Sequence, residues 1–166
     1  MTMNGINNLN ILKAESIEDI KLVSELFLEY AKSLDFHLCF QDFERELTEL
    51  PGEYAPPSGL LLLLMSEGKA AGCVALRKIE DVICEMKRLY VRPEFRGMGL
   101  GKRLAVALIG VARKLGYSSM RLDTVPSMKK AIQLYRLLGF KEIKPYRSNP
   151  VEGAIFMELD LKCIPK

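Results

Sequence analysis

Hydrophobic positions recur along the chain with two different periods, and these periods predict the order of helices and strands. An apolar-rich stretch over residues 8–14 predicts a short strand. A Ser-x-x-Asp helix start at Ser16 then precedes apolar side chains spaced three or four residues apart, which predicts an amphipathic helix over 17–34. A second, more polar helix is expected over 41–50, where a Pro-Gly pair follows.

The pattern changes after residue 59, where short apolar runs separated by tight turns predict strands. The elements predicted from there on are strands over 60–65, 70–78 and 82–91, a helix over 99–116, a strand over 120–124, a helix over 126–139 and a strand over 154–161. This order predicts one domain spanning residues 1–166, of the α/β (α+β) class, in which a mixed sheet has helices on its faces.

Charge and composition narrow the classes of function. The net charge of +3 is small and the sequence has no dense basic tract, so nucleic acid is not an expected partner. The longest apolar run, 60–65, is far shorter than the roughly 20 residues that span a bilayer, and the N-terminus lacks the pattern of a signal peptide. We therefore expect a soluble, cytoplasmic protein with no membrane partner.

The residues that commonly bind metals do not form a recognisable pattern. The four cysteines have no CxxC spacing and the chain contains one histidine, so no metal site is predicted and the thiols are expected to be reduced and mostly buried. The histidine, His37, lies in an irregular segment over 35–58, where it could contact a substrate or be an ordinary surface residue.

The most informative segment is a glycine-rich loop over 96–102, between a predicted strand and a predicted helix. Glycines at alternate positions allow a tight turn and let backbone N–H groups approach a ligand closely, and the helix N-terminus adds partial positive charge. With the cations Arg96, Lys102 and Arg103, the loop suits a phosphate or pyrophosphate, although a solvated glycine-rich turn is the alternative. The dinucleotide and Walker fingerprints both fail, because Lys102, Arg103 and Leu104 occupy positions that need other residues.

Two segments resemble motifs of the GNAT superfamily of N-acetyltransferases. Residues 89–101 resemble motif A, with Arg96, Gly99 and Gly101 at the three defined positions of the Gln/Arg-x-x-Gly-x-Gly/Ala signature. Residues 131–140 resemble motif B, and the order of the predicted elements is also similar. The sequence departs from the family pattern at Met128, where an asparagine is common, which puts one polar contact of that helix in doubt.

The resemblance implies a fold and a cosubstrate. It implies a mixed, mainly antiparallel sheet with helices on both faces, in which the parallel strands 82–91 and 119–124 splay apart to admit acetyl-coenzyme A (acetyl-CoA). Backbone groups of Leu89 and Val91 would contact the pantetheine arm, and those of 96–102 the pyrophosphate. The implied cosubstrate-binding residues are Leu89, Tyr90, Val91, Arg96, Gly97, Met98, Gly99, Leu100, Gly101 and Lys102.

The resemblance also supplies candidate catalytic groups. The N–H of Leu89 would face the thioester oxygen as an oxyanion donor. Glu85 would act through water as the base that deprotonates the acceptor. Strand alternation predicts that Glu85, Lys87, Leu89 and Val91 share one face, although Glu85 could instead pair with Lys87 or Lys78 at the surface.

Two further residues bear on the route of transfer. Tyr135, in motif B, would be the general acid for the departing thiolate, or alternatively a packing residue of its helix. Alternation places Cys84 away from Glu85 and Leu89, as a small core residue rather than a nucleophile. Direct transfer without an acyl-enzyme is therefore predicted.

These observations predict an acyltransferase that moves an acetyl group from acetyl-CoA to a primary amine of a small molecule or peptide. The alternative is a catalytically silent CoA-binding sensor or structural module. Residues 35–58 and 145–152 are expected to shape the acceptor pocket, but they contain no motif that identifies the acceptor. The acyl length and the oligomeric state stay open, with a homodimer as one alternative.

Overall fold

The computed structural model describes residues 8–34 and 42–162. Its strands and helices follow the predicted order, with one additional short strand. The elements are β1 (Leu9–Lys13), α1 (Ile17–Ser33), α2 (Phe43–Glu49), a 3-10 turn (Gly52–Tyr54), β2 (Leu60–Ser66), β3 (Lys69–Glu80), β4 (Ile83–Val91), a second 3-10 turn (Pro93–Phe95), α3 (Leu100–Lys114), β5 (Ser119–Thr124), α4 (Lys129–Leu137), β6 (Lys141–Ile143) and β7 (Ile155–Asp160).

The ends of the elements show why the sequence pattern predicted most of them and missed one. The predicted helix start is confirmed, because the Oγ of Ser16 accepts a hydrogen bond from the backbone N–H of Asp19 (3.1 Å). The missed strand is β6, which is only three residues long and largely exposed, so it has no apolar period to detect. Residue 41 of the predicted second helix and His37 lie outside the described residues.

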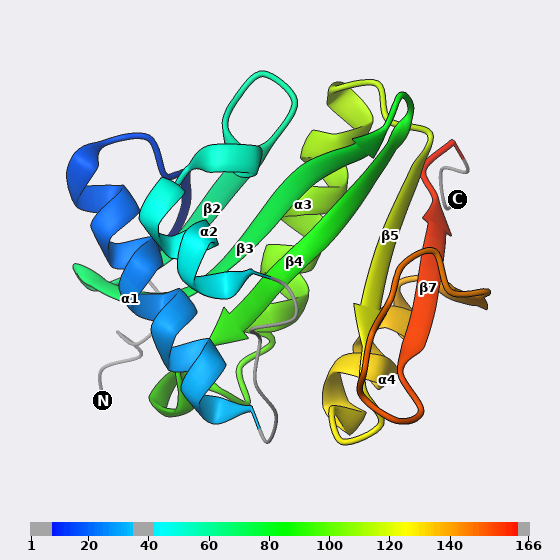
Figure 1. Cartoon of the computed structure of the whole chain (residues 1–166). Helices are drawn as coiled ribbons and strands as arrows, with labels where there is room; N and C mark the ends of the chain where they lie inside the picture. The colour runs from blue at the N-terminus through cyan, green and yellow to red at the C-terminus, as the bar shows by residue number, and fades with distance from the viewer. Residues whose placement is uncertain (1–7, 35–41, 163–166) are drawn as a thin grey trace.

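Within the described residues, seven strands form one sheet in the order β1-β2-β3-β4-β5-β7-β6. Neighbouring strands are antiparallel except β4 and β5, which are parallel. The described register of this parallel pair runs from Ile83↔Ser119 to Glu85↔Arg121, whereas β4 continues to Val91 and β5 to Thr124. The predicted splayed pair is therefore confirmed, and Figure 1 shows β4 and β5 diverging.

Helices cover both faces of the sheet, as predicted. One core packs beneath α1 and α2 and contains residues such as Phe27 and Tyr54, while the other packs beneath α3 and contains Leu104 and Leu108. Figure 1 shows α1 and α2 in front of the central strands and α3 behind them. In the described part of the chain, no helix is both long enough and apolar enough to cross a membrane.

Strand β4 contains a β-bulge at Arg88. In the ladder with β3, Lys87 lies opposite Ala75 and Tyr90 lies opposite Cys73, so β4 has two residues where β3 has one. Arg88 itself has φ 58°, in the left-handed region. The bulge lies just beyond the last described pair between β4 and β5, at the point where the two strands separate.

The bulge overturns part of the predicted alternation. Leu89 and Val91 pack against the core that contains Cys84, on the side of α3. Glu85 and Lys87 precede the bulge and lie on the opposite side from Cys84, since alternation is regular up to that point. The prediction that Glu85 and Lys87 share a face with Leu89 and Val91 is therefore wrong, as is the prediction that Cys84 faces away from Leu89. The extra residue shifts the alternation by one position.

Candidate active site

A groove of about 1000 Å³ lies where β4 ends and α3 and α4 begin. Strand β4, the glycine loop, both helix N-termini and the end of α1 line it. The cosubstrate-binding residues predicted from the resemblance line it with the exception of Met98, whose side chain is exposed. The structure therefore brings the predicted positions together around one groove.

The glycine loop owes its shape to two glycines with positive φ, Gly97 at 83° and Gly99 at 72°. Gly99 is the N-cap of α3, so no side chain caps the first N–H groups of that helix. Apart from Gly99 itself and its two neighbours in the chain, no described residue lies within 4 Å of the position that a Cβ on Gly99 would occupy. Open space in front of uncapped helix N–H groups fits a pyrophosphate.

Cations surround this loop. Lys102, Lys129 and Lys130 line the groove. Arg96 also lines it, and its Nε donates to the carbonyl of Val91 (2.9 Å), which ties the loop to the end of β4. A groove with positive charge on the helix side is suited to the phosphates of a CoA molecule.

The end of α1 forms the opposite wall of the groove, and an arginine holds it there. The guanidinium of Arg92 pairs with Glu29 of α1 (Nη2–Oε2 2.6 Å) and donates from Nη1 to the carbonyl of Ala70 (2.8 Å). The ring of Tyr30 meets that of Tyr90 edge to face, with 6.0 Å between the centroids. These contacts join α1 to β3 and β4 beside the groove.

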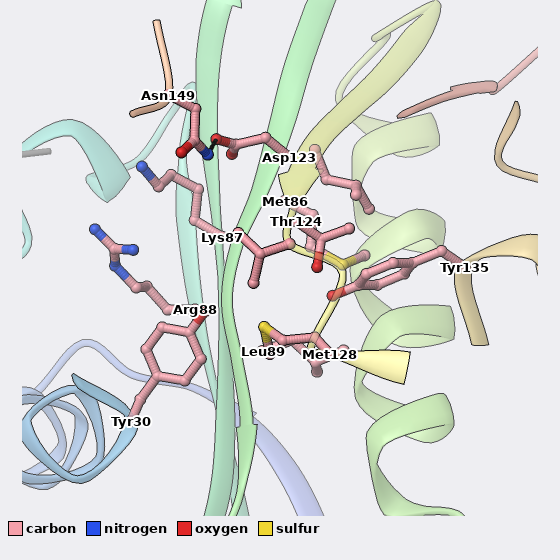
Figure 2. A pocket seen from close by; sticks show the side chains of 12 residues that line it. Tyr30, Met86, Lys87, Arg88, Leu89, Asp123, Thr124, Met128, Tyr135 and Asn149 are labelled. Carbon is pink, nitrogen blue, oxygen red and sulfur yellow. Dashed lines mark hydrogen bonds between the residues drawn. The ribbon is translucent and has the colours of Figure 1, made fainter. Parts of the chain in front are cut away.

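A smaller pocket adjoins the groove at the point where β4 and β5 separate. Tyr30, Leu89 and Met128 line both cavities, so the small pocket lies at the inner end of the groove. Figure 2 shows Leu89, Met128 and Tyr135 on one side of β4 and Lys87, Arg88 and Tyr30 on the other. A substrate in the small pocket would therefore meet a cosubstrate in the groove beside Leu89.

One hydrogen bond bears on the direction of the backbone N–H of Leu89, the predicted oxyanion donor, whose role stays a prediction. The carbonyl of Arg88 accepts a hydrogen bond from Sγ of Cys73 on β3 (3.4 Å). Because C=O and N–H point in opposite directions across a trans peptide, the N–H of Leu89 points away from β3. That is the side on which β5 has separated from β4.

Tyr135 packs against its neighbours and also lines the small pocket, while its role as the general acid stays a prediction. Its ring packs edge to face against Phe140, with 5.7 Å between the centroids. Its hydroxyl projects into the small pocket (Figure 2). Burial raises the pKa of the phenol, so Tyr135 stays protonated at physiological pH and can donate.

Glu85 lies within a buried ion-pair network. Its side chain is fully buried and is not among the described residues that line either cavity. Oε1 accepts from Nε of Arg77 (2.8 Å), and Oε2 accepts from the hydroxyl of Tyr146 (2.7 Å) and pairs with Arg147. The alternative prediction, that Glu85 pairs with a lysine at the protein surface, is therefore wrong about the location, because the carboxylate is buried. Its role as a base stays a prediction.

Several pocket residues were not singled out from the sequence. Asp123 accepts from Nδ2 of Asn149 (3.0 Å) and lies 3.5 Å from Nη2 of Arg147, so the segment over 145–152 reaches the small pocket through these contacts. Lys87 lines the same pocket, and burial, Arg88 and Arg77 lower its pKa to about 7. The signal available in the sequence was the pair of consecutive cations, Lys87 and Arg88, within a largely apolar predicted strand.

No metal centre emerges from the described part of the chain. Among residues 8–34 and 42–162, no three His, Cys, Asp or Glu side chains come close enough together to hold a metal ion.

Comparison with known sequences agrees with this architecture. A sequence model described as "Acetyltransferase (GNAT) family" matches residues 21–140. An uncharacterized N-acetyltransferase of Schizosaccharomyces pombe is 40% identical over 157 residues, which cover 93% of this chain and 96% of that protein. The chain therefore belongs to the GNAT family of N-acetyltransferases.

Solved structures share the fold. An acetyltransferase of the GNAT family from Staphylococcus aureus matches with a TM-score of 0.78 and 19% identity, covering 93% of this chain and 99% of that one. An acetyltransferase from Salmonella typhimurium solved with its cofactor acetyl-CoA matches with a TM-score of 0.69 and 20% identity, covering 93% and 95%. At these identities the likeness shows the fold.

Proposed function

We propose that this protein transfers the acetyl group of acetyl-CoA directly to a primary amine. The observation that carries the proposal is the meeting of two cavities at Leu89: a groove suited to CoA and a small polar pocket. A transferase needs both, because the acyl donor and the acceptor must meet at one carbonyl carbon. A CoA-binding sensor needs the groove alone.

The residues around the groove fit acetyl-CoA. The N-terminus of α3 and the loop over 96–102 would hold the pyrophosphate, and the backbone of Leu89 and Val91 would hold the pantetheine arm. Bound there, the thioester supplies an activated acyl group. The N–H of Leu89 donates to its oxygen as negative charge develops, a contribution worth about 3 kcal/mol in comparable sites. The hydroxyl of Tyr135 donates a proton to the departing thiolate.

Direct transfer is favoured over an acyl-enzyme. Cys84 is buried in the core, and burial raises the pKa of its thiol to about 12, so almost none of the reactive thiolate forms at neutral pH. Cys73 is also fully buried, and burial raises its pKa as well. Neither cysteine of the described residues is therefore suited to carry the acyl group, which favours the acceptor nitrogen itself as the nucleophile.

A thiol-release assay with acetyl-CoA and a panel of primary amines tests the proposal. The panel should include amino acids, polyamines and peptides with a free N-terminus or lysine. We expect CoA release above the amine-free background with at least one member, and the acetylated amine by mass spectrometry. Acetyl-CoA binding by calorimetry without release across the whole panel would favour the sensor.

A further inference from the structure

We propose that Lys87 is the general base that takes the proton from the acceptor amine. The inference rests on the proposed function and assigns one catalytic step within it. An amine with the ordinary lysine pKa of about 10.4 is mostly protonated at neutral pH, so acetylation needs a group that removes a proton. That group must reach the acceptor pocket and must itself be unprotonated near pH 7.

Glu85 does not meet the first requirement, and it is a poor proton acceptor. Both of its carboxylate oxygens are engaged by Arg77, Tyr146 and Arg147. Accepting a proton would weaken contacts with two guanidinium groups. Glu85 is also not among the described residues that line the small pocket.

Lys87 lies where the base is needed. Its side chain is 8% exposed and lines the small pocket together with Leu89. Figure 2 shows Lys87 on the same side of β4 as Tyr30 and Arg88, opposite Leu89 and Tyr135. An acceptor nitrogen between the two sides would face Lys87 with its protons and the thioester carbon with its lone pair.

The surroundings of Lys87 favour the neutral amine. Burial is the largest cause of its lowered pKa, followed by Arg88 on the same strand and Arg77 on β3. Glu46 on α2 and Asp123 on β5 act in the opposite direction. Tyr30 on α1 and Asn149 in the loop after β6 line the same pocket and are uncharged at neutral pH.

The carboxylates that oppose this shift have cationic or polar partners of their own. Glu46 receives two hydrogen bonds from Arg88, from Nε and Nη2, each 2.9 Å long. Asp123 is held by Asn149 and lies 3.5 Å from Arg147. With a pKa of about 7, Lys87 is neutral in roughly half of the molecules at pH 7.

The protons balance over one cycle. Nζ of Lys87 takes one proton from the acceptor ammonium, and the freed nitrogen forms the C–N bond as the C–S bond breaks. The hydroxyl of Tyr135 protonates the thiolate and is restored by a second proton from the acceptor nitrogen. The products are the amide and free CoA, and Lys87 returns its proton to water.

Substitution by arginine separates a base from a mere positive charge. Lys87→Arg keeps the charge but cannot release a proton near neutral pH, and Lys87→Met removes the charge at similar length. We expect both variants to lose about 10²-fold or more in kcat/KM for the acceptor at pH 7, with acetyl-CoA affinity unchanged. Lys78→Arg, on a half-exposed lysine of β3, is the matched control and should match wild type.

The pH profile is the sharper readout. Wild-type kcat/KM should rise through pH 7 and then level off, gaining about twofold between pH 7 and 9. A variant without the base depends on acceptor molecules that are already neutral, and their fraction grows roughly a hundredfold over that range for a pKa of about 10.4. The ratio of wild type to Lys87→Arg should therefore fall about fifty-fold. A ratio within threefold of one at pH 7, or a ratio that stays constant from pH 7 to 9, overturns the proposal.

A titration that needs no activity completes the test. In protein labelled with 13C at the lysine Cε, the resonance that Lys87→Met lacks should titrate near pH 7, and a midpoint above 9 overturns the proposal. Failure of the proposed function looks different, because wild type would then release no CoA with any amine.

Discussion

Replacing Glu85 by glutamine should destabilise the protein strongly. The carboxylate is fully buried between Arg77 and Arg147, whose side chains are each 20% exposed. Burial, and after it the charge of Arg77, lower the pKa of Arg147 to about 10, so the carboxylate offsets the burial of this guanidinium as well as its repulsion from Arg77. Removing one partner from a buried ion pair costs about 3–5 kcal/mol. For a chain of this length each kcal/mol lowers Tm by about 2–4 °C, so we expect a decrease of roughly 10 °C.

Thermal unfolding followed by circular dichroism measures this decrease. Glu158→Gln is the matched control, because Glu158 on β7 pairs with Arg121 at 2.7 Å but is 31% exposed. Such a pair contributes about 1 kcal/mol or less, so Tm should fall by no more than about 4 °C. A Tm for Glu85→Gln within about 2 °C of wild type would refute the reasoning. The same variant tests the role predicted from the family resemblance: a base at Glu85 requires activity that recovers at alkaline pH, whereas a structural carboxylate predicts a constant ratio to wild type from pH 6 to 9.

Three further substitutions test the cosubstrate groove, the proposed general acid and the packing within the sheet. Gly99→Glu places a carboxylate and a strained φ of 72° where N–H groups face the groove, so calorimetry should show acetyl-CoA affinity reduced more than about tenfold. Tyr135→Phe keeps the packed ring and should lower kcat by at least about tenfold with little change in Tm, and a kcat within twofold of wild type would leave Tyr135 a packing residue. Gly72→Ala would put its Cβ 2.6 Å from the carbonyl oxygen of Tyr90, so the free energy of unfolding should fall by about 1–3 kcal/mol. Gly110→Ala in α3 is the control, because open space surrounds this position and the variant should not be destabilised.

Local periodicity was sufficient for most of the fold. The helix over 17–34 and the strand over 82–91 have long apolar patterns, and their predicted ends lie within a residue of those in α1 and β4. Strand β6 could not be predicted in this way, because it is short and largely exposed and is held in the sheet by pairing with β7. A pairing between distant segments leaves no local trace in the sequence.

In the candidate site, too, the local motif could be predicted from the sequence and the long-range contacts could not. The glycine loop over 96–102 is a local motif, and its residues met at the groove as the resemblance implied, except Met98. Tyr146 and Arg147 meet Glu85 from more than 60 positions away, in a segment with no regular element. A contact of this kind depends on the tertiary fold, so strand alternation around Glu85 could not reveal it.

The bulge at Arg88 connects the two halves of the proposed mechanism. In a regular strand, Lys87 and Leu89 would project to the same side, because side chains alternate with a period of two. The amine of Lys87 would then face the groove that is suited to CoA, where it would compete with the acceptor for the thioester. One extra residue turns the side chain of Leu89 toward the α3 side while that of Lys87 stays on the opposite side of β4. The same insertion lies where β5 leaves β4. A single irregularity in β4, close to the point where the sheet opens, therefore places the side chains of Lys87 and Leu89 on opposite sides of the strand.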